Sequence, residues 1–166
     1  MQMTDDLDRL SAETGVALRA RGMMLVSAES CTGGGIGEAV TRTAGSSAWF
    51  ERGFVTYANQ AKQEMLGVRA ETLVAFGAVS EPTAREMALG ALCASHADMA
   101  VSVTGIAGPE GGTAGKPVGM VCFCWALKEG SLTTETCYFS GGRAEVRRQA
   151  IIHALRGVIQ LCASKP

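Results

Sequence analysis

The sequence predicts an α/β fold, namely a three-layer α/β/α sandwich built on a mixed sheet. In the first two thirds of the chain, segments with helically spaced apolar residues alternate with short apolar runs that are typical of buried strands. Two further strand-like runs, 118–127 and 132–139, follow one another across a short polar connection, which indicates an antiparallel hairpin. The 166 residues, of which 47% are hydrophobic and 19% are charged, suit one packed domain over residues 1–166.

Start and stop signals in the sequence give the order of the elements. Helices are expected over 5–21, from about 33 to 45, over 59–66, from 80 to 96 and over 143–161. Strands are expected over 23–28, 53–57, 98–103, 118–127 and 132–139. Ser80 is a typical N-cap, and Pro82 is tolerated in the first turn of its helix. Asn59 and Gly67 are the expected cap and stop of the helix over 59–66.

The overall charge and hydropathy exclude several classes of partner. The net charge of −1 gives no broad basic field to attract nucleic acid or anionic lipid, so neither is an expected partner. No apolar run approaches the roughly 20 residues that a membrane-spanning helix needs, and residues 1–21 lack the apolar core of a signal peptide. The expected location is therefore the cytoplasm, and an anionic ligand must be held by a local pocket.

The six cysteines are expected to be free, mostly buried thiols in a reducing compartment. They are Cys31, Cys93, Cys122, Cys124, Cys137 and Cys162. Two-residue spacing puts Cys122 and Cys124 on one face of a strand, where packing in the core is the favoured role. Because the sequence has no C-x2-C pair and no paired histidine, no metal site is expected. Cys31 is a rival nucleophile to its neighbour Ser30.

Two glycine-rich segments, 30–37 and 104–117, each follow a predicted strand and are expected to be loops. In open α/β sheets, ligands bind beyond the carboxyl ends of the strands, so both loops are expected to line one cleft. A helix that starts near Gly33 would direct free backbone N–H groups into this cleft, where they could hold a phosphate or an oxyanion. The segments match neither a P-loop, a dinucleotide fingerprint nor a Gly-x-Ser-x-Gly elbow.

Ser30 lies at the first of these turns, where a serine can act as a nucleophile or simply as a helix N-cap. Its spacing alone favours the cap. A nucleophile needs a base, and the two histidines, His96 and His153, both fall in predicted helices. Lys62 is the alternative base if burial lowers its pKa, with Tyr57 nearby at a strand end. From the pattern alone, a surface lysine and a half-buried tyrosine are the simpler interpretation.

Five segments carry long and distinctive motifs that together span nearly the whole chain. They are AESCTGGGIGEAV (28–40), AGSSAWFERGFVTYANQAKQEMLGV (44–68), GAVSEPTAREMALGAL (77–92), SVTGIAGPEGGTAGKPVG (102–119) and FSGGRAEVRRQA (139–150). In these segments the chain resembles the C-terminal domain of the competence/damage-inducible CinA proteins, in the stand-alone form of the nicotinamide-nucleotide amidohydrolases.

The resemblance implies hydrolysis of the carboxamide of nicotinamide mononucleotide to nicotinate mononucleotide and ammonia. This is a step of pyridine nucleotide salvage, and the resemblance implies that it needs neither a metal nor an organic cofactor. The implied catalytic residues are Ser30, Tyr57 and Lys62. In this scheme Ser30 attacks the amide, and Lys62 takes its proton directly or through Tyr57.

The same interpretation assigns substrate binding to both loops and to the start of the last helix. Backbone N–H groups of Thr32, Gly33 and Gly34 would bind the oxyanion, while Thr104, Gly105 and Arg143, or Arg147, would bind the ribose and phosphate. Gly142 stands where the family usually has an aspartate, so the resemblance implies no orienting carboxylate beside Arg143. A nucleotide-binding or regulatory module without catalysis is the alternative function. An exposed apolar helix face would support a homodimer.

Overall fold

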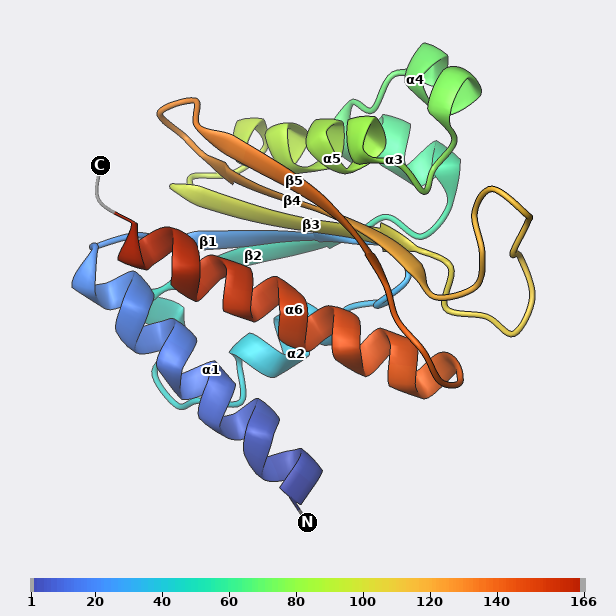
Figure 1. Ribbon diagram of the computed structural model, residues 1–166. Helices are drawn as coiled ribbons and strands as arrows, with labels where there is room; N and C mark the ends of the chain where they lie inside the picture. Colours follow the sequence, from blue (N-terminus) through green and yellow to red (C-terminus); the bar gives the residue numbers. More distant parts are fainter. Residues whose placement is uncertain (1, 165–166) are drawn as a thin grey trace.

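The computed structural model describes residues 2–164, with side chains from residue 6 onward, and is built on one five-stranded sheet. The strands are β1 (Leu25–Glu29), β2 (Phe50–Val55), β3 (Met99–Gly105), β4 (Met120–Leu127) and β5 (Leu132–Tyr138). Their order across the sheet is β2-β1-β3-β4-β5. β1 pairs in parallel with β2 and β3, whereas β3–β4 and β4–β5 are antiparallel. The predicted mixed sheet and the predicted hairpin are therefore confirmed (Figure 1).

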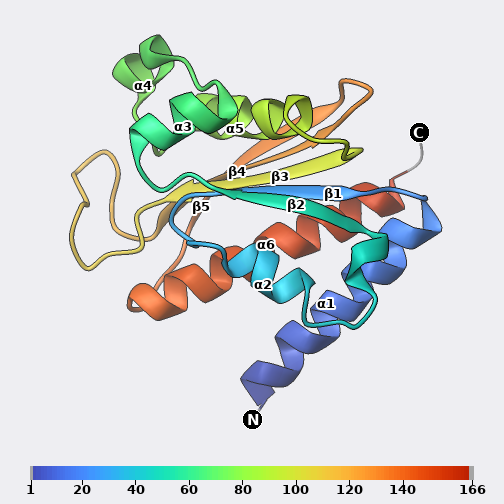
Figure 2. The same cartoon turned by 180° about the vertical axis from the view of Figure 1, so that it is seen from behind.

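Helices cover both faces of the sheet and complete the predicted three layers (Figures 1 and 2). One layer holds α1 (Gln2–Ala20), α2 (Gly35–Val40) and α6 (Arg143–Ala163). The opposite layer holds α3 (Asn59–Leu66), α4 (Ala70–Phe76) and α5 (Glu81–Cys93). A single 3-10 turn, η1 (Ser46–Ala48), precedes β2. Within residues 2–164, no helix combines the length and the apolar character that a membrane span requires.

The core is divided by the sheet into two apolar clusters, because successive strand side chains point to opposite faces. Val101 and Phe123 belong to the cluster under α1, α2 and α6. Ala100, Cys122 and Cys124 belong to the cluster under α5. Both cysteines are fully buried, which confirms their predicted packing role.

Several element boundaries differ from the predicted ones for local reasons. Ser80 caps α5 as predicted, since its Oγ accepts a hydrogen bond from the Thr83 amide at 3.3 Å. Gly67 ends α3 in the left-handed conformation, with φ of 68°. The predicted cap of α3 is wrong: Ala58 holds the extended N-cap position without a side-chain bond, and the helix begins at Asn59 itself.

Two further differences concern the second layer and β2. Helix α4 was not predicted because it is only seven residues long, has no side-chain cap, and leaves Val74 and Phe76 exposed rather than on an inward apolar face. Helix α5 ends at Cys93, so His96 lies outside the helix that was expected to contain it. β2 begins three residues before the predicted start. The expected homodimer stays a prediction.

Candidate active site

The turn after β1 places Ser30 at the carboxyl end of the central parallel strands. The Ser30 amide donates to the Val103 carbonyl of β3 at 3.0 Å, and the Gly33 amide donates back to the Ser30 carbonyl at 3.0 Å. Gly33 and Gly34 adopt left-handed backbone angles, with φ of 59° and 100°. This tight turn leaves Ser30 only 8% exposed. Gly34 is the N-cap of α2 and makes no side-chain cap bond, so the interpretation of Ser30 as a helix cap is wrong.

The buried carboxylate of Glu29 occupies the start of α2. Its Oε1 accepts the Thr32 hydroxyl at 2.6 Å and the Ile36 amide at 2.8 Å, and its Oε2 accepts the Gly37 amide at 3.1 Å. An acidic group in this place satisfies N–H groups that the first turn of a helix otherwise leaves without a partner. These N–H groups are therefore directed at Glu29, and the expectation that the α2 start points them into the cleft is wrong.

Replacing Glu29 by alanine should destabilise the fold, because three donors, two of them buried, lose their acceptor. We expect the free energy of unfolding to fall by about 3 kcal/mol, measured by urea denaturation. Glu38→Ala is the matched control on the same helix, since the Glu38 carboxylate is exposed and forms an ion pair with Arg42. That variant should lose about 0.5 kcal/mol. Equal losses in the two variants would contradict a supporting role for Glu29.

Lys62 of α3 is the buried partner of Ser30. The lysine is 1% exposed, and its Nζ lies 2.9 Å from Ser30 Oγ. Nζ also donates to the main-chain carbonyl oxygens of Thr56 at 2.9 Å and of Tyr57 at 3.1 Å. Burial lowers the pKa of Lys62 below the 10.5 of a free lysine, because the charged amine loses its solvation.

The three contacts of Lys62 fit a neutral amine in one arrangement. A neutral amine has two N–H groups and one lone pair, and the carbonyls of Thr56 and Tyr57 can accept both N–H groups. The lone pair then faces the Ser30 hydroxyl, which can donate its proton to Nζ. This arrangement would suit a serine nucleophile and a lysine base, a pairing that the sequence pattern alone did not favour.

The Tyr57 side chain lies elsewhere in the cleft and is 58% exposed. Its hydroxyl accepts a hydrogen bond from Arg143 Nη2 at 2.9 Å, while Arg143 Nη1 donates to the Gly108 carbonyl at 2.9 Å. The direct contact of Tyr57 with Lys62 is made by its main-chain carbonyl and not by its phenol. Arg143 is therefore oriented by Tyr57 and Gly108.

An open cleft of about 280 Å³ surrounds the pair, near the lower end of the roughly 300–1,000 Å³ range of small-molecule sites. Its lining comes from the Ser30 turn, the start of α3, residues 78–79, the loop after β3 and Arg143. The Thr104 hydroxyl lines it and donates to the Ala78 carbonyl at 2.8 Å. Gly105 lines it where a side chain has no room, since a Cβ would lie 2.7 Å from the Val121 side chain.

The remaining predicted binding residues do not line the cleft. Thr32, Gly33 and Gly34 are not among its lining residues, and Thr32 is fully buried with its hydroxyl bonded to Glu29. Arg147 of α6 holds this turn from outside: its Nε donates to the Cys31 carbonyl at 3.2 Å and its Nη2 to the Thr32 carbonyl at 3.1 Å. The sequence had suggested Arg147 only as a second phosphate ligand, and no spacing rule identifies this bracing contact.

The rival nucleophile and the histidines are not suited to the chemistry. Burial raises the pKa of the Cys31 thiol to about 12, so this sulfur stays protonated and unreactive at neutral pH. His96 and His153 are not among the cleft-lining residues. Among the described residues, Ser30 and Lys62, whose Oγ and Nζ atoms lie 2.9 Å apart, are therefore the candidate nucleophile and base.

Comparison with known proteins places this architecture in a family. A model of the CinA C-terminal domain matches residues 7–162. The chain belongs to the CinA C-terminal domain family. A relative from Escherichia coli K12, "Nicotinamide-nucleotide amidohydrolase PncC", is 57% identical over 159 residues, which are 95% of this chain and 96% of that protein. A protein of the same name from Pseudomonas putida is 48% identical, covering 95% and 98% of the two chains.

Solved structures of the CinA family confirm the fold. The competence/damage inducible protein CihA from Agrobacterium tumefaciens superposes with a TM-score of 0.91 at 48% identity, over 94% of this chain and 95% of that one. The competence damage-inducible protein A from Klebsiella pneumoniae gives the same TM-score at 41% identity, over 96% and 99% of the two chains. The resemblance found in the sequence motifs is thus confirmed over nearly the full length.

Proposed function

We propose that this CinA-family protein is an amidohydrolase that converts nicotinamide mononucleotide to nicotinate mononucleotide and ammonia. The observation that carries the proposal is the buried Lys62 amine, 2.9 Å from the Ser30 hydroxyl at the base of an open cleft. The near full-length identity to proteins named nicotinamide-nucleotide amidohydrolases supplies the substrate. In the cell this reaction would return the pyridine ring to nucleotide salvage, in the cytoplasm.

In the proposed reaction, Ser30 Oγ forms a bond to the carboxamide carbon while its proton passes to neutral Lys62. The carbonyl oxygen becomes an oxyanion, which the Cys31 backbone N–H is placed to bind. Cys31 lines the cleft next to Ser30, and no backbone carbonyl within residues 2–164 accepts a hydrogen bond from its amide. Protonated Lys62 then delivers its proton to the amide nitrogen, the carbon–nitrogen bond breaks, and this nitrogen leaves as ammonia.

The resulting Ser30 ester is then hydrolysed by water, again with Lys62 as the base. Lys62 takes a proton from a water molecule as the water oxygen attacks the ester carbon, and it returns that proton to Ser30 Oγ when the ester bond breaks. Tyr57 takes part through its carbonyl, which orients the Lys62 amine, and through its hydroxyl, which positions Arg143. We assign Thr104, Gly105 and Arg143 to the ribose and phosphate side of the cleft.

Ammonia release from nicotinamide mononucleotide tests the proposal directly. The purified protein should produce nicotinate mononucleotide and ammonia in equal amounts, with little turnover of free nicotinamide, which lacks the groups that Arg143 and the loop after β3 would bind. Saturable binding of the mononucleotide without ammonia release would instead favour the nucleotide-binding module. Equal turnover of free nicotinamide would contradict the nucleotide as the preferred substrate.

The activity should rise with pH as Lys62 loses its proton. Because burial lowers the pKa of Lys62, the active neutral form is lost as the pH falls through a midpoint below 10.5. We expect kcat/KM, measured between about pH 6 and pH 10, to show a limb that depends on one proton. A midpoint close to about 6 would report the substrate phosphate instead. A flat profile above that pH would contradict the lysine as the base.

Replacing Arg143 by alanine should weaken substrate binding more than it slows the chemical step. Loss of a charge-assisted bond to the phosphate is expected to raise KM for nicotinamide mononucleotide by about 10- to 100-fold. Nicotinamide riboside is the control substrate, because it lacks the phosphate and its KM should change little. An equal rise in KM for both substrates would show that Arg143 acts on the shape of the cleft and not on the phosphate.

A further inference from the structure

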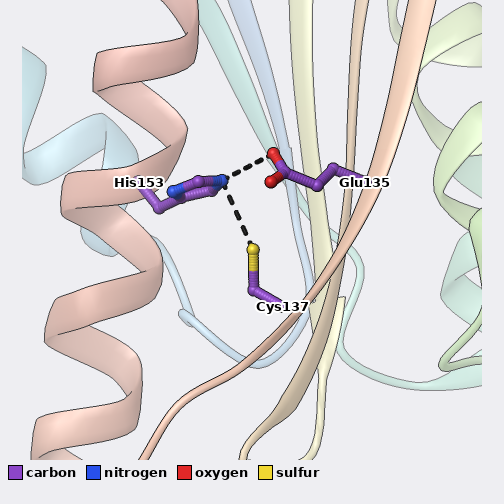
Figure 3. A group of neighbouring side chains, drawn as sticks. All are labelled: Glu135, Cys137 and His153. Carbon is purple, nitrogen blue, oxygen red and sulfur yellow. Dashed lines mark hydrogen bonds and ion pairs between the residues drawn. The ribbon is translucent and has the colours of Figure 1, made fainter.

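Three side chains of metal-ligand type converge between β5 and α6, on residues that play no part in the cleft (Figure 3). Glu135 and Cys137 are two positions apart on β5, so both point to the face that α6 covers. His153 reaches them from α6, with its Nε2 2.8 Å from Glu135 Oε2 and 3.4 Å from Cys137 Sγ. The three ligand atoms all lie within 4.8 Å of one another.

We propose that Glu135, Cys137 and His153 bind one Zn²⁺ ion. A tetrahedral zinc ion with bonds of about 2.0–2.1 Å to nitrogen and oxygen and about 2.3 Å to sulfur separates its N and O ligands by about 3.3 Å, and its N and S ligands by about 3.6 Å. The separations in the structure are 2.8 Å and 3.4 Å. These two separations are therefore within about half an ångström of those in a zinc site, and the third, between Glu135 and Cys137, is at most 4.8 Å.

The convergence on one nitrogen argues for a metal site over a catalytic relay. In a nucleophile–histidine–acid relay, the nucleophile contacts one ring nitrogen and the orienting acid contacts the other. Here Cys137 and Glu135 both contact Nε2 of His153. In a metal site, the other ligands likewise lie close to the one imidazole nitrogen that binds the ion.

The chemistry of the three ligands selects among metals. Thiolate and imidazole are ligands that Zn²⁺ accepts readily, whereas Mg²⁺ and Ca²⁺ prefer oxygen alone. Zn²⁺ would displace the thiol proton of Cys137, and the thiolate and the Glu135 carboxylate would then balance the two charges of the ion. Three protein ligands leave a fourth position for water.

The cluster is both preorganised and accessible. The His153 ring packs against three aromatic rings, with centroid distances of 4.8 Å to Phe123, 5.7 Å to Trp125 and 6.1 Å to Phe139. Glu135 and His153 also line a surface hollow of about 390 Å³. An ion can therefore reach a histidine whose orientation is already fixed, which reduces the ordering needed for binding.

Cobalt(II) titration of the tag-free, reduced and metal-stripped chain tests the site. We expect one equivalent of Co²⁺ to give a thiolate-to-cobalt charge-transfer band, and one equivalent of Zn²⁺ to displace it. Cys137→Ser should remove the band, and Glu135→Gln should weaken Zn²⁺ binding at least about tenfold. Cys93→Ser is the matched control, because Cys93 is an exposed thiol at the end of α5, and this variant should retain the band.

Three results would overturn the site: no charge-transfer band in the unmodified chain, a band that survives Cys137→Ser, or a band that disappears in Cys93→Ser. Circular dichroism of the metal-free Glu135→Gln variant checks that the exposed carboxylate is not needed for folding. Ser30→Ala should bind Co²⁺ as the unmodified chain does, so the outcome is independent of the proposed amidase activity.

Discussion

Replacing Ser30 by alanine is expected to lower ammonia release from nicotinamide mononucleotide by at least about 10³-fold. The variant loses the hydroxyl that Lys62 Nζ contacts, so the proposed covalent ester cannot form. Substrate affinity should change little, because the groups assigned to the ribose and phosphate are untouched. The measurement is kcat together with KM, and the loss should fall on kcat.

The same variant should keep the fold, which makes the loss of activity interpretable. Ser30 contributes its amide to the bond with Val103 and its carbonyl to the bond with Gly33, and both main-chain bonds survive the change. We expect the free energy of unfolding to change by about 1 kcal/mol or less. Cys31→Ala tests the rival nucleophile and should keep most of the activity. Substantial turnover by Ser30→Ala, or its complete loss in Cys31→Ala alone, would overturn the assignment of the nucleophile.

Replacing Lys62 by methionine should lower kcat by a similar factor, again about 10³-fold or more. Methionine fills much of the volume of the lysine stem but offers no lone pair to accept the Ser30 proton. The carbonyls of Thr56 and Tyr57 lose their donor, so the fold should be destabilised by about 1–3 kcal/mol at neutral pH. The readouts are single-turnover kinetics and urea denaturation.

The pH dependence of stability gives Lys62 a second signature that does not involve activity. Its pKa is lowered in the folded chain, so between that pKa and 10.5 the unfolded chain binds more protons. The contribution of Lys62 to stability therefore rises with pH through this window and is lost as the pH falls through the folded pKa. Lys62→Met should lack this slope, whereas Lys128→Met, at an exposed lysine, should retain it.

Lys62→Arg separates a base from a fixed positive charge. A guanidinium stays protonated at all accessible pH values, so it can stabilise a negative charge but cannot take the Ser30 proton. We expect this variant to be as inactive as Lys62→Met. A kcat close to that of the unmodified chain would show that Lys62 acts by its charge and would contradict its role as the base.

The sequence was sufficient for the layers and the sheet because those depend on periodicity and on short connections. Alternating helical and strand-like segments required parallel neighbours, and the polar residues between 118–127 and 132–139 required a hairpin. Helix α4 was not predicted because Val74 and Phe76 are exposed, so its apolar residues do not mark a buried face. The N-cap residue of α3 was predicted wrongly because Ala58 takes this position through its backbone conformation, without a side-chain hydrogen bond.

In the candidate site, the sequence identified individual residues but not the contacts between residues that are far apart in the chain. Ser30 and Lys62 were identified as candidates, but their 2.9 Å contact depends on strand pairing that no local pattern contains. The role of Glu29 was missed for a related reason. Its carboxylate accepts hydrogen bonds from amides seven and eight residues later in the chain. From the sequence, the free amides at this helix start were expected to bind the ligand. Arg147 acts across more than a hundred residues of chain, on the carbonyls of Cys31 and Thr32.

The irregular pairing of β1 with β2 determines where insertions and deletions can occur in the segment that leads to Lys62. The register shifts between Leu25 and Val26, leaving Glu51 as an extra residue, and is regular from there to the Glu29–Val55 pair. β2 is an edge strand, so β1 is the one strand of the sheet that pairs with it. A slip of one residue would carry the chain leading to Lys62 by about 3.3 Å, more than the whole hydrogen bond to Ser30. We therefore expect insertions and deletions to be tolerated before the bulge, where the pairing is already irregular. Within residues 52–62 they should not be tolerated, because a change of length there would move Lys62 relative to Ser30.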